Sequence, residues 1–331
     1  MIKKTHVFFG LLLLTAQIHA EEVQVQPAPH YDAHAEFYSD SDDLNVQQYS
    51  IGYSKGDKIF DYRHELEKSG ENLWGVEIKR NRIDQKNAAD YDGYAANVSV
   101  ARKFSDNVSA SASIGRSQLE NSFTQADDSL TTYGLATRIK LNKQVELHAS
   151  HSKDFLFQDA IVEDENGNLL SGKSSDVSLY WRAQKKIRVQ GAAGHRSLSD
   201  GNAANKVSGS VLYGISADWP WIWTGVSAER LSYNQDKSSY WAPDKYTSYG
   251  VVLDSSFPVN DNLSMSLGAN LNRSKEDNNP TGTGYSVSAG ANWTVTDNVE
   301  LDIHGDILKS SQEASDWRQD QLGLSLRVKS Y

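Results

Sequence analysis

The sequence predicts an all-β fold, a closed antiparallel transmembrane β-barrel of about 16 strands. Three observations lead to this prediction. Apolar and polar residues alternate with a period of two, the alternating segments are long, and the connections between them are short and long in turn. Together these features are typical of barrels in which one face of each strand meets lipid and the other lines a lumen.

The alternation is clearest near the C-terminus. In 299–307, Val299, Leu301, Ile303 and Ile307 share one face, and charged or imidazole side chains occupy the other. Similar runs are found at 45–54, 58–67, 72–82, 92–103, 107–117, 130–141, 144–153, 173–183, 186–196, 205–216, 221–232, 247–257, 263–271, 285–293 and 320–331. Many have about 10–12 residues, enough for a tilted strand to cross a bilayer, whereas strands of soluble sandwiches usually have about 5–6.

The connections support the same architecture. Short turns are predicted at 104–107, 141–143, 184–186, 258–262 and 294–298, and longer polar segments at 117–129, 153–172, 196–205, 233–246, 272–283 and 309–319. Short periplasmic turns and longer external loops are the usual arrangement of outer-membrane barrels. An open sheet edge is not tolerated in hydrocarbon, so the sheet must close, and about 16 strands enclose a lumen too wide for side chains to fill. Tyr94, Trp74, Trp181, Trp221, Trp223, Tyr285 and Trp293 lie near strand ends and are expected in the interfacial aromatic girdles.

The first 44 residues are predicted to precede the barrel. Lys3 and Lys4, an apolar core at 7–14 and small residues up to Ala20 predict a signal peptide over 1–20. Residues 21–44 are interpreted as a periplasmic extension, because an even strand count favours this, although 31–40 also alternates and an extra strand remains an alternative. Residues 45–331 form the predicted barrel. The expected location is the outer membrane of a Gram-negative bacterium.

Composition excludes several other classes of protein. The net charge of −10 disfavours nucleic-acid binding, and the absence of cysteine removes disulfides and thiolate metal sites. Apart from the leader, no run approaches the ~18–20 apolar residues of a membrane-spanning helix. The alternative fold is a secreted β-solenoid or sandwich with one buried face.

The charged face is the predicted lumen wall. Side chains expected to line it include Glu300, Asp302, His304 and Asp306 on one strand, with Arg182 and Arg188 elsewhere. Asp61, Arg63, Glu65, Glu77, Lys79, Arg138, Glu146, Asp254 and Arg327 are expected to point inward as well. These side chains either only solvate the wall and pair across strands, or they form weak contacts with a polar solute in a hydrated conduit.

Enzymatic chemistry is not expected. His148 shares a face with Glu146 and Ser150, but such spacing is inevitable in a strand with a polar face. The run 164–168 resembles the start of a calcium loop but lacks the distal glutamate, so a hairpin tip is the better interpretation. No catalytic residue, metal or cofactor is predicted.

The segment 239–246 is the most distinctive loop of the sequence. Tyr240, Trp241 and Tyr246 surround Pro243, which suggests a rigid platform on which sugar rings stack. The alternative is a structural loop folded over the pore mouth or packed in the girdle.

This loop and the strands after it resemble a known family. Tyr240, Trp241, Ala242, Pro243 and Tyr246 match, with two substitutions, the Tyr-Phe-Ser-Pro-x-x-Tyr motif of outer-membrane exopolysaccharide-export proteins, which secrete cellulose or poly-N-acetylglucosamine. The resemblance covers about residues 239–331 and implies a 16-stranded barrel that passes a polysaccharide. Those exporters carry helical repeats before the barrel, and no 34-residue repeat is present here.

The resemblance makes a passive exopolysaccharide conduit the leading functional hypothesis. Its expected partners are outer-membrane lipids and lipopolysaccharide, a polysaccharide, and a separate periplasmic protein that delivers the polymer. The alternatives are a porin for small hydrophilic molecules and a plugged barrel with a structural or adhesive role.

Overall fold

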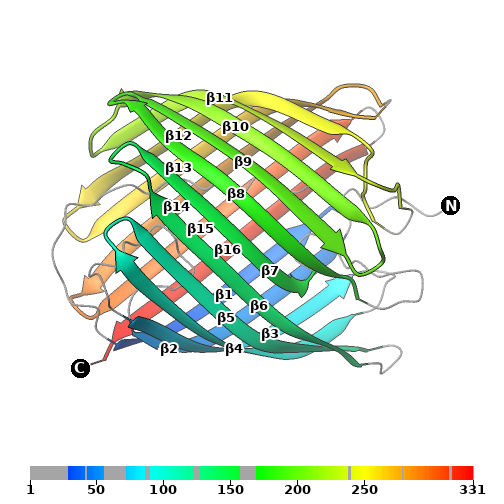
Figure 1. Ribbon diagram of the computed structural model, residues 1–331, viewed down its shortest axis with the longest axis horizontal. Helices are drawn as coiled ribbons and strands as arrows, with labels where there is room; N and C mark the ends of the chain where they lie inside the picture. The colour runs from blue at the N-terminus through cyan, green and yellow to red at the C-terminus, as the bar shows by residue number, and fades with distance from the viewer. Residues whose placement is uncertain are drawn as a thin grey trace.

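The computed structural model describes residues 29–41, 43–55, 72–85, 90–122, 127–156, 169–237, 240–277, 279–312 and 315–330. These residues form sixteen β-strands, shown in Figure 1. They are β1 (Pro29–Asp40), β2 (Leu44–Lys55), β3 (Asn72–Gln85), β4 (Tyr91–Ser105), β5 (Val108–Asn121), β6 (Asp127–Lys140), β7 (Val145–Phe155), β8 (Ser171–Gln184), β9 (Ile187–Leu198), β10 (Ala203–Ser216), β11 (Trp221–Tyr233), β12 (Tyr246–Asn260), β13 (Leu263–Glu276), β14 (Gly282–Thr296), β15 (Val299–Gln312) and β16 (Ser315–Lys329).

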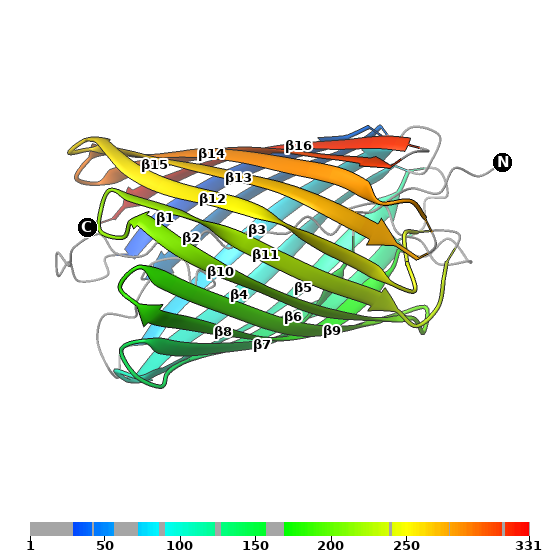
Figure 2. The same cartoon turned by 90° about the horizontal axis from the view of Figure 1, so that it is seen from above.

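The strands close into one antiparallel barrel. Each pairs with its neighbours in sequence, and β1 pairs with β16 to complete the ring, with Ala33 opposite Leu326. Figures 1 and 2 show the strands steeply tilted around the barrel, with β14–β16 on one side and β7–β9 on the other. The predicted fold class is therefore confirmed. In the described ranges, no helix is long and apolar enough to cross a membrane.

The first strand corrects the predicted domain boundary. Residues 29–40, interpreted above as part of a periplasmic extension with an extra strand as the alternative, form that strand, β1, which pairs with both β2 and β16. Tyr31 and Phe37 lie exposed on the outer face, continuing the apolar surface of the barrel. Pairing on both sides supplies hydrogen-bond partners for the backbone of this segment, which hydrocarbon requires. This requirement explains why the segment forms a strand although its apolar and polar residues alternate only weakly. The predicted strand at 58–67, the signal peptide at 1–20 and the hairpin tip at 164–168 lie outside the described residues.

The outer face is apolar, as a lipid-facing surface requires. Large apolar side chains are exposed at alternate positions of the strands, for example Ile51, Val98, Val211 and Leu322. Trp74, Trp181 and Trp293 lie toward one end of this surface, and Tyr94 and Tyr285 toward the other. Trp221 and Trp223 were predicted to join them, which is wrong. Both are buried on the inner face, because they share the parity of Leu231 and Tyr233.

The two ends of the barrel differ. The turn end carries short connections such as 106–107, 261–262 and 297–298. The loop end carries the longer connection 234–245 and also 199–202, which is as short as 217–220 at the turn end. Strands extend further toward the loop end than predicted, since β15 and β16 take up most of 309–319. Polar outward side chains such as Lys309 and Arg318 occupy this extension, which breaks the apolar alternation that the prediction followed.

Candidate functional site: the barrel lumen

The inner face of β15, β16 and β1 is rich in acids. Alternation directs Glu300, Asp302, His304 and Asp306 of β15 inward, as predicted, opposite the outward Ile303 and Ile307. Asp32 and Glu36 of β1 join them across the closing seam, and we call these five carboxylates, Asp32, Glu36, Glu300, Asp302 and Asp306, the acidic wall. Asp32 and Glu36 were not predicted to line the lumen, because their segment was expected to lie outside the barrel.

Basic side chains partly balance the acidic wall at the turn end. Arg327 of β16 lies between two of its carboxylates, with Nε 3.1 Å from Asp32 and Nη1 3.6 Å from Glu300. Lys329 approaches Glu300 at 3.7 Å. Nearer the middle of the strands the carboxylates contact imidazoles, since His304 lies 3.3 Å from Asp302 and His34 lies 3.5 Å from Glu36. The middle of this wall therefore keeps an excess of negative charge.

The two imidazoles of the acidic wall are stacked across the seam. The rings of His34 and His304 have centroids 6.4 Å apart and are nearly parallel. Gly323 of β16 lies against His304, and a Cβ atom at that position would fall 2.2 Å from the ring. Glycine is therefore required here for the imidazole to lie flat on the wall.

Cations predominate on the opposite wall. Arg182, Arg188, Arg196 and Lys206 project inward from β8, β9 and β10, and Asp176 is the acid between them. Lys206 pairs with Glu229 at 2.9 Å. Figure 2 shows that these strands lie across the barrel from β15 and β16. A solute in the lumen thus meets negative charge on one side and positive charge on the other, an arrangement that orients dipolar groups.

The two predicted basic contacts differ in accessibility. Arg182 is exposed near the turn end, whereas Arg188 is only 6% exposed. Its guanidinium carbon lies 3.7 Å from the ring centroid of Trp223 and 5.9 Å from that of Trp221. This cation–π stack anchors Arg188 in the wall, so Arg182 is the better placed of the two to meet a solute.

The candidate catalytic arrangement is an ion-pair network. His148 hydrogen-bonds Glu146, whose other carboxylate oxygen accepts from Arg138 Nη2 at 2.6 Å. Glu146 is thus engaged on both oxygens, which fits the interpretation that such side chains pair across the wall. Among the described residues, no three His, Asp or Glu side chains are grouped so as to hold a metal ion.

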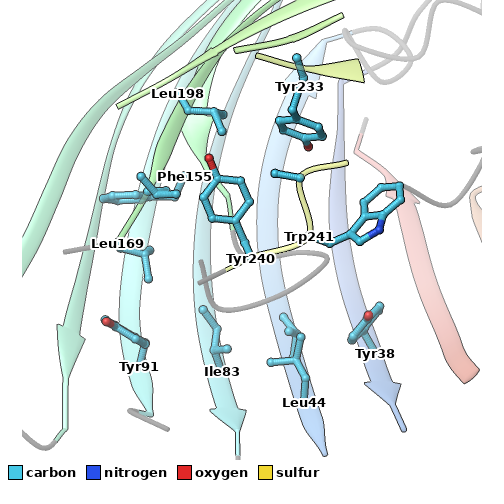
Figure 3. Packing of buried hydrophobic residues seen from close by; sticks show 14 of the residues in the cluster. Tyr38, Leu44, Ile83, Tyr91, Phe155, Leu169, Leu198, Tyr233, Tyr240 and Trp241 are labelled. Atoms are coloured by element: carbon cyan, nitrogen blue, oxygen red, sulfur yellow. The ribbon is translucent and has the colours of Figure 1, made fainter. Parts of the chain in front are cut away.

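A hydrophobic cluster fills the lumen at the loop end. Here the inward positions of nearly all strands are apolar instead of polar, and loop residues cover them (Figure 3). We call this cluster the apolar plug; its principal members are Tyr38, Leu44, Val46, Ile83, Tyr91, Leu119, Leu130, Phe155, Leu169, Leu170, Leu198, Leu231, Tyr233, Tyr240, Trp241, Tyr246 and Trp317. Leu44, Ile83 and Leu119 point into the barrel yet have no exposed surface, so the mouth of the lumen is occupied.

The predicted aromatic platform belongs to the apolar plug. Tyr240 and Trp241 are only 6% and 5% exposed, and Tyr246 is buried as well. The Tyr240 ring lies 6.2 Å from that of Tyr233, and the Trp241 ring 5.4 Å from that of Tyr246. In this arrangement the rings face protein, as expected for the alternative of a loop folded over the pore mouth. Sugar stacking on these rings stays a prediction.

Hydrogen bonds fix the loop 234–245 to the connection between β9 and β10. The Tyr240 hydroxyl donates to Asp200 Oδ2 at 2.9 Å and accepts from Asn202 Nδ2 at 2.8 Å. Asn202 also donates to the Gln235 carbonyl at 2.9 Å, and Pro243 accepts from the Tyr233 amide at 2.9 Å. Burial and the nearby Asp200 carboxylate raise the pKa of the Tyr240 hydroxyl, which stays protonated at neutral pH. Asp200 and Asn202 had no distinguishing signal in the sequence.

The two groups of predicted site residues are therefore separate. Glu300, Asp302, His304 and Asp306 lie on the lumen wall, and Tyr240, Trp241, Pro243 and Tyr246 lie in or beside the apolar plug at the loop end. A solute that crosses the barrel would meet the wall and the plug one after the other.

The acidic wall should control ion selectivity once the mouth is open. In a background opened by Tyr240→Ala and Trp241→Ala, we expect Asp302→Asn with Asp306→Asn to reduce the cation-to-anion permeability ratio by about half, because fixed charge sets the local ion concentration. The reversal potential across a KCl gradient measures this ratio. Asp320→Asn, which removes an outward-facing carboxylate of β16, is the matched control and should leave the ratio unchanged. An equal ratio in all variants would contradict an electrostatic role of the wall.

Comparison with known proteins places the chain by its fold. No family model matches the sequence, and no curated protein is significantly similar to it. A bacterial polysaccharide outer membrane secretin superposes with a TM-score of 0.71 over 93% of this chain and 100% of that one, at 11% identity. CdiB from Acinetobacter baumannii gives a TM-score of 0.50 over 92% of this chain and 60% of its own length, at 10% identity. Pseudomonas aeruginosa OccK11 gives 0.47 over 92% and 96%, at 8% identity. The chain has the fold of Gram-negative outer-membrane channel barrels.

Proposed function

We propose that this barrel is an outer-membrane conduit through which an exopolysaccharide leaves the cell, and that its outer mouth is closed at rest. The loop end then faces the exterior and the turn end the periplasm, following the usual arrangement of such barrels. The observation that carries the proposal is the apolar plug above a polar lumen. A polar wall suits a hydroxyl-rich polymer, and a closed mouth suits a channel that opens only when its substrate reaches it.

Two further observations support a polysaccharide. The segment around Tyr240 and Pro243 resembles the motif of exopolysaccharide exporters, and one solved structure that superposes over its whole length is a polysaccharide secretin. The lumen also suits slow sliding, because its ion pairs and stacked imidazoles offer many weak polar contacts. Repeated weak contacts permit transit, whereas a single tight site would stall the polymer.

A porin for small hydrophilic molecules is the second candidate. The transverse separation of acidic and basic walls favours it, because such a field orients small dipolar solutes. A general porin, however, requires a water-filled path that is open at rest. The fully buried side chains of Leu44, Ile83 and Leu119 at the mouth weigh against such a path.

The export role requires other components. The signal peptide predicted over 1–20 would direct export of the chain across the inner membrane. A separate periplasmic protein would deliver the polymer to the turn end.

Polymer block of single channels tests the proposal. In planar bilayers, the variant opened at Tyr240 and Trp241 should show current interruptions when a long linear glucan is added on the turn-end side. Each interruption should remove most of the open current, because an extended sugar chain fills much of a 16-stranded lumen. Glucose at the same mass concentration should cause no resolved block.

The same experiments would also identify a porin for small molecules. If glucose and the linear glucan give the same current, and liposomes containing the opened barrel swell rapidly in monosaccharides, the porin function is supported and the export function is contradicted. Secretion of polymer by cells that lack the chain would contradict the export role independently.

A further inference from the structure

The outer surface of the barrel carries a group of cations at the loop end of β11–β16. Arg230, Arg273, Lys275, Lys309 and Arg318 all have the outward parity of their strands. Their sequence neighbours Leu231, Ser274, Glu276, Ser310 and Trp317 are buried on the inner side. The cations thus face the surroundings of the barrel and not its lumen.

The register brings these side chains into adjacent rows. Arg230 lies opposite Thr247, which in turn lies opposite Lys275 on the next strand. Arg273 shares the face of Lys275 two positions away, and Lys309 lies directly opposite Arg318. The five cations thus lie on neighbouring strands at the same end of the barrel.

Few acids neutralise this group. Two acids are described beside it: Asp320, which Arg318 Nη2 contacts at 2.9 Å, and Asp277, which is exposed just beyond the end of β13 and accepts from the Lys245 amide. No ion pair to Arg230, Arg273 or Lys275 is formed within the described ranges. On the face of β3–β5, by contrast, Arg80 is 2.8 Å from Asp92, and Arg82 is 3.2 Å from Asp84.

The surface beneath the cations is built for lipid. Tyr249 lies opposite Arg273, and Tyr285 lies opposite Lys309, so an aromatic ring lies beside two of the cations. Toward the middle of the barrel follow the exposed apolar side chains of Val251, Leu253, Leu271, Val287, Ile307 and Leu322. A ligand that fits the whole surface has anionic groups above several acyl chains, with the polar boundary at the height of the tyrosines.

We propose that this face of β11–β16 binds lipopolysaccharide, with its phosphorylated sugar head group on the five cations and its acyl chains on the apolar surface below. With the loop end toward the exterior, the orientation of the proposed function, these cations lie at the outer leaflet, where this lipid is the abundant phosphorylated component. Arg230 and Arg273 can each form two parallel hydrogen bonds to a phosphate, and Lys275 supplies a further charge. The proposal does not depend on what passes through the lumen.

A binding measurement with the purified full chain in detergent tests this assignment. The probes are purified lipopolysaccharide, the same lipid after removal of its phosphates, and phosphatidylglycerol. We expect the intact lipopolysaccharide to bind at least about tenfold more tightly than either of the others. The variant Arg230→Gln, Arg273→Gln, Lys275→Gln should bind at least about tenfold more weakly. Each Lys or Arg near an anionic lipid surface contributes severalfold to the binding constant, and three are removed.

A matched variant controls for charge. Arg80→Gln, Arg82→Gln, Arg116→Gln removes three outward cations from β3 and β5 and should change the affinity by less than about twofold, because these side chains already have polar partners. Folding of every variant is checked by its heat-modifiable migration in gels. If the triple variant does not fold, Arg273→Gln and Lys275→Gln are measured singly, and each should weaken binding.

Three results would overturn the proposal. The first is unchanged affinity in the folded triple variant or in both single variants. The second is an equal loss in the β3 and β5 control, which would indicate a general effect of net charge. The third is equally tight binding of phosphatidylglycerol or of the dephosphorylated lipid, which would indicate a surface for any lipid.

Discussion

Replacing Tyr240 and Trp241 with alanine should convert a closed barrel into an open channel. The two rings lie within the apolar plug, and truncating a buried aromatic side chain typically costs about 3–5 kcal/mol. Alanine at position 240 also removes the hydroxyl that joins Asp200 and Asn202, which leaves the loop 234–245 less firmly held. We expect the mean conductance in planar bilayers to rise at least about tenfold, to that of a wide aqueous pore.

The control for this prediction is a double variant that replaces one tyrosine and one tryptophan of the lipid-facing surface. Tyr94→Ala with Trp293→Ala removes the same two ring types from exposed outer positions and should leave the channel closed. Asn202→Ala, which removes only the hydrogen bonds of the anchor, should give brief openings of intermediate frequency. A barrel that conducts fully before any substitution would contradict the closed resting state. One that stays closed in the double variant would show that the loop is not what holds the mouth shut.

Deleting residues 29–40 should prevent the barrel from forming. Without β1, the facing edges of β2 and β16 would leave their backbone N–H and C=O groups unpaired in the membrane, at a cost of several kcal/mol for each group. Any direct pairing of β2 with β16 would join strands of the same direction, against the antiparallel pattern of every other pair. We expect the deleted chain to lose the heat-modifiable gel migration and the protease resistance of a folded barrel.

A replacement distinguishes the loss of a strand from the loss of particular residues. An unrelated 12-residue segment with apolar residues at the four central outward positions of β1, which are Tyr31, Ala33, Ala35 and Phe37, should restore folding in place of 29–40. The central His34–His304 stack would then be absent, so recovery would also show that the stack is not needed for closure. Normal migration of the chain with the simple deletion would contradict the closure of the ring by β1.

The fold could be predicted because its dominant constraint is local. Because one face of each strand meets lipid and the other meets water, apolar and polar residues alternate with a period of two. The adjacent residues Asp302, which faces the lumen, and Ile303, which faces lipid, show this alternation. The segment of β1 was assigned to an extension because its outward residues include two alanines, which give a weak apolar signal. Its second pairing partner, β16, also lies at the other end of the chain, so a local pattern does not reveal it. Trp221 and Trp223 were placed outside because position near a strand end was given more weight than parity with Leu231.

The site was only partly predictable. The inward parity of Glu300 to Asp306 follows from alternation alone, and the structure agrees. The apolar plug depends on contacts between loops distant in sequence, such as Tyr240 with Asp200, which no periodicity encodes. One signal was nevertheless present. Toward the loop end, inward positions such as Ile83, Leu119 and Leu130 become apolar, so the alternation fails where the lumen closes.

The packing of the apolar plug also sets the force that is needed to open the mouth of the barrel. A polymer pushed outward by its synthesis would reach the cluster from below and would do work against its packing. If displacing the loop costs about 5 kcal/mol over a path of about 10 Å, the force required is on the order of tens of piconewtons. A molecule arriving from outside by diffusion exerts no such sustained thrust. In the proposed export role, the apolar plug would then open only in the outward direction. A polymer driven from the periplasm would displace it, whereas external solutes would remain excluded and no separate gate would be needed.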